Sequence, residues 1–163
     1  MRRADREIKQ IEEIAEVLSR CDTIRLGIAD DGAPYIVPVS FGFELTDGRI
    51  AVYFHGAKAG RKAELMDASP RICVEADLCH GFPYNGQGGY TCDYESVIGW
   101  GRVELASGDL ANHAAKLLCE HCGIQAEGCP PDEMAHTNFY CVKLDELTGK
   151  RRYPAKPDKE HNS

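Results

Sequence analysis

The sequence VYFHGAKAGRK, residues 52–62, contains an apolar strand that ends in a glycine-flanked turn and then opens a helix. Three cations follow the strand within five residues, at Lys58, Arg61 and Lys62. A helix N-terminus presents backbone N–H groups and the positive end of its dipole, and the cations add charge at the same point. This combination predicts a site for an anion, which we interpret as the phosphate group of a cofactor. The alternative for the three cations is a solvated helix face.

The composition is that of a globular protein. A chain of 163 residues is long enough for one domain with a real core, and 43% apolar with 28% charged residues is ordinary for this class. The net charge of −7 is opposite to the basic footprint of nucleic-acid binding, so we expect no nucleic-acid partner. We expect a single domain over residues 1–163, with a core of about 5–147 and a polar tail at 148–163.

The N-terminal segment MRRADREIKQ has no apolar stretch behind its arginines, so it does not predict a secretory signal. No window approaches the roughly 20 apolar residues of a membrane span. We therefore expect a cytoplasmic protein without a membrane partner. In that setting its eight cysteines are expected to be reduced thiols.

Helical and strand-like segments follow one another along the chain. Asp5 is expected to cap a first amphipathic helix that ends near Arg20. Later helices are expected at 58–68 and 109–122. Strands are expected at 23–29, 35–44, 49–55, 71–78, 91–105 and 138–144. Sequential hairpins with a helical insertion predict a mainly β fold, a small closed or nearly closed antiparallel barrel with two or three helices.

Two pairs of residues qualify this pattern. Pro34 and Pro38 indicate an edge strand or a bulge, because proline cannot donate to a strand ladder. Gly99 and Gly101 lie inside a strand and indicate either a bend or the close approach of another group.

Taken together, these segments resemble the flavin-binding split-barrel superfamily of pyridoxamine 5'-phosphate oxidase, and within it the nitroimidazole-resistance branch. The matching pieces are CDTIRLGIADDGAPYIVPVSFGFE, VYFHGAKAGRKAEL, PRICVEAD and YESVIGWGRVE, in this order. The resemblance implies a six-stranded antiparallel split β-barrel of the Greek-key type with flanking helices. It also implies a homodimer with FMN bound at the interface between the subunits.

The same resemblance assigns candidate cofactor contacts. The cations implied to hold the FMN phosphate are Lys58, Arg61 and Lys62. The residues implied to run along the isoalloxazine are Pro38, Val39 and Ser40. Those implied to lie beside the ring or the ribityl chain are Phe54, His55 and Gly56. A polar contact near the phosphate is implied for Ser96, which is followed by Val97.

The implied function is FMN-dependent reduction of small nitroaromatic compounds, such as 5-nitroimidazoles, with electrons from a nicotinamide. His55 is the candidate catalytic residue, as a tunable proton donor near the flavin, although a structural turn role is equally open. A carrier or sensor that binds flavin or haem without turnover is the alternative function. Oxidation of pyridoxamine phosphate is not expected, because the sequence departs from that enzyme's pattern after Val142 and ends in GKRRYPAKPDKEHNS.

A zinc site is the competing interpretation. Cys119 and Cys122 form a Cys-x-x-Cys pair, and Cys129 with a histidine such as His113 or His136 would complete four ligands. A single Cys-x-x-Cys inside a helical pattern is weak evidence, and no second pair follows. We therefore predict no metal site.

Overall fold

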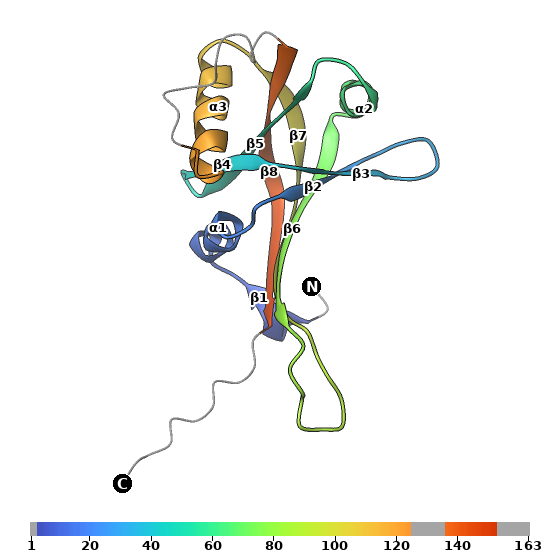
Figure 1. Ribbon diagram of the computed structural model, residues 1–163, viewed down its shortest axis with the longest axis vertical. Helices are drawn as coiled ribbons and strands as arrows, with labels where there is room; N and C mark the ends of the chain where they lie inside the picture. The colour runs from blue at the N-terminus through green and yellow to red at the C-terminus, as the bar shows by residue number, and fades with distance from the viewer. Residues whose placement is uncertain (1–2, 125–135, 153–163) are drawn as a thin grey trace.

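The computed structural model describes residues 3–124 and 136–152 of the chain. These residues form a mostly antiparallel sheet with helices packed against it (Figure 1). The elements follow in the order η1 (Ala4–Arg6), β1 (Glu7–Ile8), α1 (Ile11–Ser19), β2 (Ile24–Ile28), β3 (Tyr35–Val39), β4 (Phe41–Thr46), β5 (Arg49–Ala57), α2 (Arg61–Ala68), β6 (Arg71–Gly81), β7 (Asp93–Ala106), α3 (Asp109–His121) and β8 (Thr137–Arg152).

The sheet has the strand order β3-β2-β6-β7-β8-β5-β4, and β1 adds to the far end of β8. Figure 1 shows β2, β3 and β4 crossing the long strands β6, β7 and β8 steeply, so the sheet curls around its inner face. It does not close, because β3 and β4 lie at the two ends of the strand order. The expected mainly β fold with flanking helices is confirmed.

The main core fills the concave face of this curled sheet. Its fully buried members include Leu18 from α1, Leu26 from β2 and Val52 from β5. A second, smaller cluster lies under α3, where three alanines of the helix pack on Tyr53 and Phe139. Because alanine side chains are short, α3 lies close against β5 and β8.

Gly101 explains the glycine pattern of the long strand β7. The β7–β8 register shifts between Trp100 and Gly101, and a Cβ at Gly101 would lie 2.2 Å from the carbonyl oxygen of Lys143. The bulge therefore needs a residue without a side chain. The group that approaches these glycines closely is the neighbouring strand β8.

The strand count was wrong. The expected single strand at 35–44 is divided at the exposed Ser40 into β3 and β4, and the short strand β1 was not expected, so the described residues form eight strands. Because β3 and β4 lie at opposite ends of the sheet, the first strands do not form a continuous meander. The edge position expected from Pro38 is confirmed, since β3 is the terminal strand.

Both ends of the expected core also differ. The first helix begins at Ile11, because Glu7 and Ile8 instead pair with β8. Asp5 caps no helix and pairs with Arg3. At the other end, β8 continues to Arg152, so the core extends past the expected limit of 147. Residues 153–163 of the expected tail lie outside the described residues.

None of the helices in the described part of the chain has the length and apolar content needed to span a bilayer.

Candidate functional site

The stretch 52–62 forms the expected strand, turn and helix. β5 lies between β4 and β8 and runs to Ala57, and α2 begins at Arg61 after Gly60, whose φ of 116° lies in a region that favours glycine. Among the described residues, the segment His55–Ala57 pairs with the first residues of β8 alone, because β4 ends its ladder at Phe41, opposite Phe54. The end of β5 is therefore open on one side, next to the start of α2.

Lys62 extends back from α2 over the open end of β5. Its Nζ donates to the carbonyl oxygen of His55 at 3.2 Å and lies 5.8 Å from the ring centroid of Phe54. The side chain is half-buried, and the loss of water around it lowers the pKa of Lys62 below its usual 10.5. Among the described residues no carboxylate pairs with Lys62, so its charge is available to a bound anion.

Gly56 makes room for this ammonium group. A Cβ at Gly56 would lie 2.4 Å from Nζ of Lys62 and 2.7 Å from its Cε. Because no real Cβ contact is that short, any larger residue would displace Lys62 from the end of β5.

Arg61 points elsewhere. Its guanidinium forms an ion pair with Asp30, in the turn between β2 and β3, and lies 5.9 Å from the ring centroid of Tyr35. The hydrogen bond from Arg61 lowers the pKa of Asp30. A phosphate group that recruits Arg61 must therefore compete with a carboxylate already in place.

Lys58 lies at a cavity of about 250 Å³ between α2 and the ends of β7 and β8. The cavity is also lined by Met66 and Pro70, and by Asn138 and Tyr140 from β8. Two cations, Lys58 and Lys62, are thus placed near the start of β8, which pairs with the end of β5.

Two further predicted residues, Ser40 and His55, meet at this end. The β4–β5 ladder starts with Phe41 opposite Phe54, so Ser40 and His55 are the next residues on either strand, and both are exposed. The ring centroid of His55 lies 6.0 Å from that of Phe139. Pro38 and Val39 precede Ser40 in β3, where Pro38 is exposed. The β4–β5 register thus places Ser40 and His55 at the end of β5 over which Lys62 extends.

The remaining predicted residues are placed differently. The side chains of Phe54 and Val97 are buried in the core, so only their main chains can contact a surface ligand. Ser96 is opposite Lys150 on β8, whereas Gly56 is opposite Asn138. These two β8 positions are twelve residues apart, roughly 40 Å along a strand. One chain does not bring Ser96 and Val97 to the cations.

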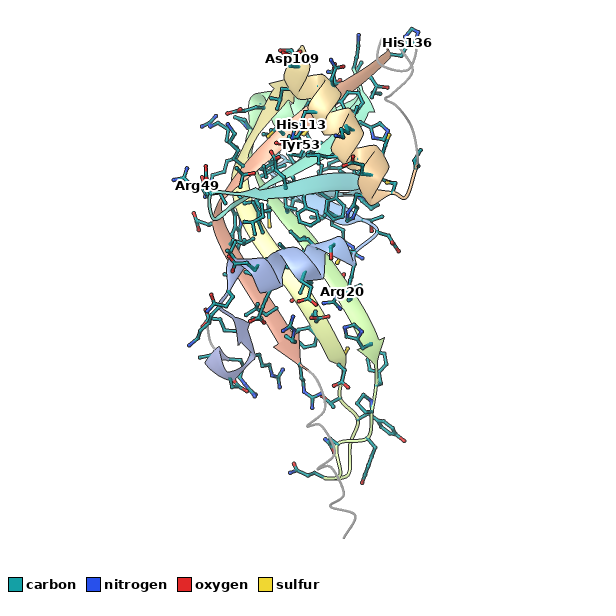
Figure 2. The ribbon with its side chains drawn as sticks, turned by 90° about the vertical axis from the view of Figure 1, so that its left-hand side faces the viewer. Arg20, Arg49, Tyr53, Asp109, His113 and His136 are labelled. Atoms are coloured by element: carbon teal, nitrogen blue, oxygen red, sulfur yellow. The ribbon has the colours of Figure 1, made fainter. Side chains whose placement is uncertain are left out.

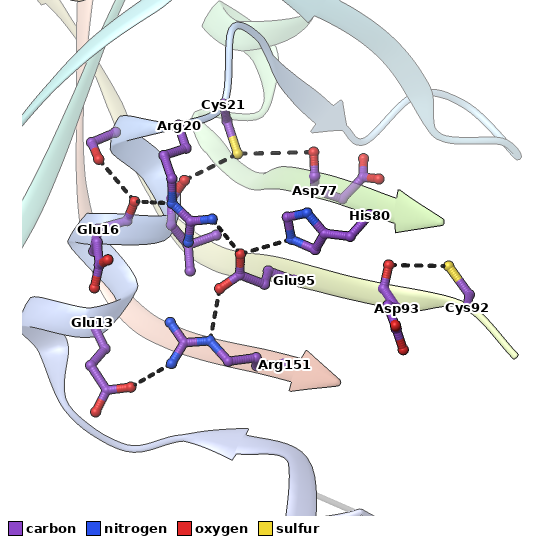
Figure 3. A network of polar contacts seen from close by, with 12 residues as sticks. Glu13, Glu16, Arg20, Cys21, Asp77, His80, Cys92, Asp93, Glu95 and Arg151 are labelled. Atoms are coloured by element: carbon purple, nitrogen blue, oxygen red, sulfur yellow. Dashed lines mark hydrogen bonds and ion pairs between the residues drawn. The ribbon is translucent and has the colours of Figure 1, made fainter. Parts of the chain in front are cut away.

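The sequence analysis missed a buried ionic cluster next to Ser96. Glu95 has no exposed surface and accepts bonds from Arg20 at 2.6 Å and from Arg151 at 2.7 Å, with Nε2 of His80 at 2.9 Å (Figure 3). Arg151 also pairs with Glu13 of α1. Strand alternation could have indicated this cluster, because it places Glu95 on the inward side with Val97, where a carboxylate needs partners.

A second missed cluster joins α3 to the β4–β5 hairpin. The Tyr53 hydroxyl donates to Glu44, and Nε2 of His113 lies 3.0 Å from the same carboxylate (Figure 2). Burial, followed by the hydrogen bond with Glu44, raises the pKa of Tyr53. This contact fixes α3 on the sheet, away from the cations of α2.

The cysteine pair of α3 has no metal-site geometry in the described part of the chain. No group of three or more His, Cys, Asp or Glu side chains gathers there as a metal site. His121 packs 4.3 Å from the ring centroid of Phe41 and places Nε2 2.8 Å from the carbonyl oxygen of Cys21. Cys129, which the zinc interpretation requires, lies outside the described residues.

The model of a protein family described as pyridoxamine 5'-phosphate oxidase matches residues 10–151. Among solved structures, a candidate 5-nitroimidazole antibiotic resistance protein from Bacteroides thetaiotaomicron is similar, with 26% identity, a TM-score of 0.77, and coverage of 88% of this chain and 85% of that chain. An FAD-binding protein from Mesorhizobium loti shows 27% identity and a TM-score of 0.62 over 91% of this chain and 98% of that chain.

A third structure, the flavocytochrome Anf3 from Azotobacter vinelandii, shares the fold. It shows 23% identity and a TM-score of 0.75, over 98% of this chain and 75% of that chain. A search of curated proteins finds no match.

Proposed function

The chain belongs to the pyridoxamine 5'-phosphate oxidase family, and on this basis we propose that it is an FMN-dependent oxidoreductase that holds the flavin phosphate at the junction of β5 and α2. The observation that carries the proposal is Lys62. Its half-buried ammonium group lies over Gly56 at the open end of β5 and has no carboxylate partner among the described residues. Keeping a charge half-buried is unfavourable unless an anion compensates it.

The residues around this point fit a phosphate ester that carries a flat ring. Lys62 and Lys58 would bind phosphate oxygens, and Arg61 would join them by turning from Asp30. Pro38 and Val39 at the end of β3, with the exposed Ser40 that follows, would lie along the isoalloxazine, with His55 and Gly56 opposite. Phe54 and Val97 would contribute main-chain contacts only.

We propose that two copies of the chain complete the site. Ser96 and Val97 lie too far along the sheet to reach the cations of their own chain, so on this proposal they come from the partner. The outer face of the sheet offers a surface for pairing. It has an apolar groove of about 330 Å³ next to Gly27 and Cys73, and Ile36 at its edge is 57% exposed.

For the reaction, we propose reduction of small nitroaromatic compounds with a nicotinamide as the electron donor. The 26% identical relative described as a candidate 5-nitroimidazole resistance protein supports this substrate class. When bound, FMN supplies the electron transfer, and the protein binds and orients it. On this proposal, the exposed ring of His55 would hold or donate a proton beside the flavin.

A carrier or sensor that binds a flavin without turnover is the second candidate. It is supported by the 27% identical relative, whose description names FAD binding and no reaction. The same cations would serve this function.

Anaerobic absorbance spectroscopy distinguishes the two. We expect the flavin band of the FMN-loaded protein to bleach with a reduced nicotinamide and to return when a 5-nitroimidazole is added. A flavin that dithionite bleaches and nicotinamides do not would contradict the proposed electron donor. If the dithionite-reduced flavin is not reoxidised by the nitroimidazole, the carrier is favoured.

A further inference from the structure

Two cysteine thiols are in contact where β6 ends and β7 begins. Sγ of Cys79 lies 3.6 Å from Sγ of Cys92, and the two residues are 13 positions apart in sequence. A disulfide bond is about 2.05 Å long, so the two sulfur atoms must approach by about 1.5 Å to form one. Cys79 is exposed and Cys92 half-buried, so small reagents can reach the pair.

Strand pairing and ionic contacts surround the two cysteines, and Figure 3 shows Cys92 together with His80 and Glu95. Cys79 is opposite Tyr94 in the β6–β7 ladder, and the next residue, His80, is bonded to the buried Glu95. The carbonyl oxygen of Cys92 accepts a hydrogen bond from Arg152 at 3.3 Å, and Arg152 also pairs with the buried Asp93. The β6–β7 register shifts between Cys79 and Gly81, so the two thiols meet beside a bulge whose neighbouring residues make these contacts.

We propose that Cys79 and Cys92 form a redox-modification site, a dithiol that a low-molecular-weight disulfide such as oxidised glutathione converts into a disulfide between β6 and β7. The thiolate of Cys79 attacks one sulfur of the small disulfide, forms a mixed disulfide and releases one small thiolate. The thiolate of Cys92 then attacks Sγ of Cys79, forms the internal disulfide and releases the second small thiol. The dithiol is oxidised, the small disulfide is reduced to two thiols, and the two protons pass to solvent or the departing thiolates.

The order of attack follows from exposure. Desolvation, followed by the hydrogen bond with Cys79, raises the pKa of the Cys92 thiol. The exposed Cys79 is therefore the thiol that meets the reagent first, and Cys92 resolves the mixed disulfide.

A disulfide between Cys79 and Cys92 would link the two ends of the segment that lies between them. This segment exposes three aromatic side chains, with Phe82 at 67%, Tyr84 at 60% and Tyr90 at 76%. Tyr84 and Tyr90 face each other across an isolated bridge, with ring centroids 5.7 Å apart. A covalent bond at the base restrains this aromatic segment against opening.

The test exposes the native protein to oxidised glutathione, blocks remaining thiols with N-ethylmaleimide and maps the peptides by mass spectrometry. We expect a cross-linked peptide pair containing Cys79 and Cys92, lighter by two hydrogen atoms and reversed by dithiothreitol. Cys79→Ser and Cys92→Ser should each abolish it, whereas Cys122→Ser, which removes another exposed thiol, should leave it intact. A stable glutathione adduct on Cys79, or full alkylation of both cysteines, would overturn the proposal.

Limited proteolysis gives a second readout. Chymotrypsin cleaves after aromatic residues, and we expect cleavage at Phe82, Tyr84 and Tyr90 to slow several-fold in the cross-linked protein. If the oxidised and reduced proteins are cleaved there at the same rate, the disulfide does not restrain the segment.

Discussion

Replacing Lys62 with alanine should weaken FMN binding more than any other single change among the three cations of α2 and its turn. Its ammonium group lies at the open end of β5, 3.2 Å from the carbonyl oxygen of His55, and no described carboxylate competes for it. A hydrogen bond to a charged group contributes about 1.5–3 kcal/mol. Its loss corresponds to a rise in Kd of roughly 10- to 100-fold.

Arg61→Ala should have a smaller effect, because Arg61 is already paired with Asp30 and binding must break that pair. Lys116→Ala is the matched control, since Lys116 is an exposed lysine of α3 that pairs with Glu120 at 3.7 Å. The assay is quenching of flavin fluorescence during titration of the apoprotein, with circular dichroism to check the fold. An unchanged Kd in Lys62→Ala, or a larger loss of affinity in Arg61→Ala, would show that Lys62 is not the main contact of the phosphate.

Three further predictions concern other described residues. Gly56→Ala should weaken FMN binding about as much as Lys62→Ala while the chain still folds, because the new Cβ displaces the ammonium group; titration and circular dichroism measure the two effects. Glu95→Ala should lower the free energy of unfolding by about 3 kcal/mol in urea titration, since it leaves Arg20 and Arg151 without their shared carboxylate. A loss below about 1 kcal/mol would contradict that role. Burial raises the pKa of the Cys21 thiol to about 11 from 9.0, so the unfolded chain loses this proton at a lower pH than the folded protein. The free energy of unfolding should therefore fall as the pH rises from 9.0 to about 11, and Cys21→Ala should reduce that fall. An identical pH profile in the variant would count against this role of Cys21.

The strand, turn and helix at 52–62 could be predicted because every signal is local. The apolar run, Gly60 and the cations are all contained in a few residues, and the structure places β5 and α2 there. The division at Ser40 could not be predicted in this way. Ser40 lies between two β-forming runs, and a serine does not predict a strand break as a glycine or proline would. The division between β3 and β4 is evident from the strand order of the sheet.

The ion-pair partners of charged residues could not be predicted where those partners are distant in sequence. Arg61 is expected to contact a phosphate, and its partner Asp30, 31 positions away, was not predicted. Arg151 was assigned to a polar tail, yet it lies in β8. There its guanidinium donates a hydrogen bond to the buried Glu95, 56 positions earlier in the sequence. The ion-pair partner of a charged residue depends on the tertiary fold when that partner is distant in sequence, so the local sequence does not predict it.

A comparison of FMN with riboflavin tests whether the cations at the junction of β5 and α2 hold the phosphate of FMN. The two ligands share the ring and ribityl chain and differ only in the phosphate. We expect the wild-type protein to bind FMN at least 100-fold more tightly, which corresponds to about 2.7 kcal/mol. Lys62→Ala should reduce this difference. Equal affinity of the wild-type protein for FMN and riboflavin would contradict the account.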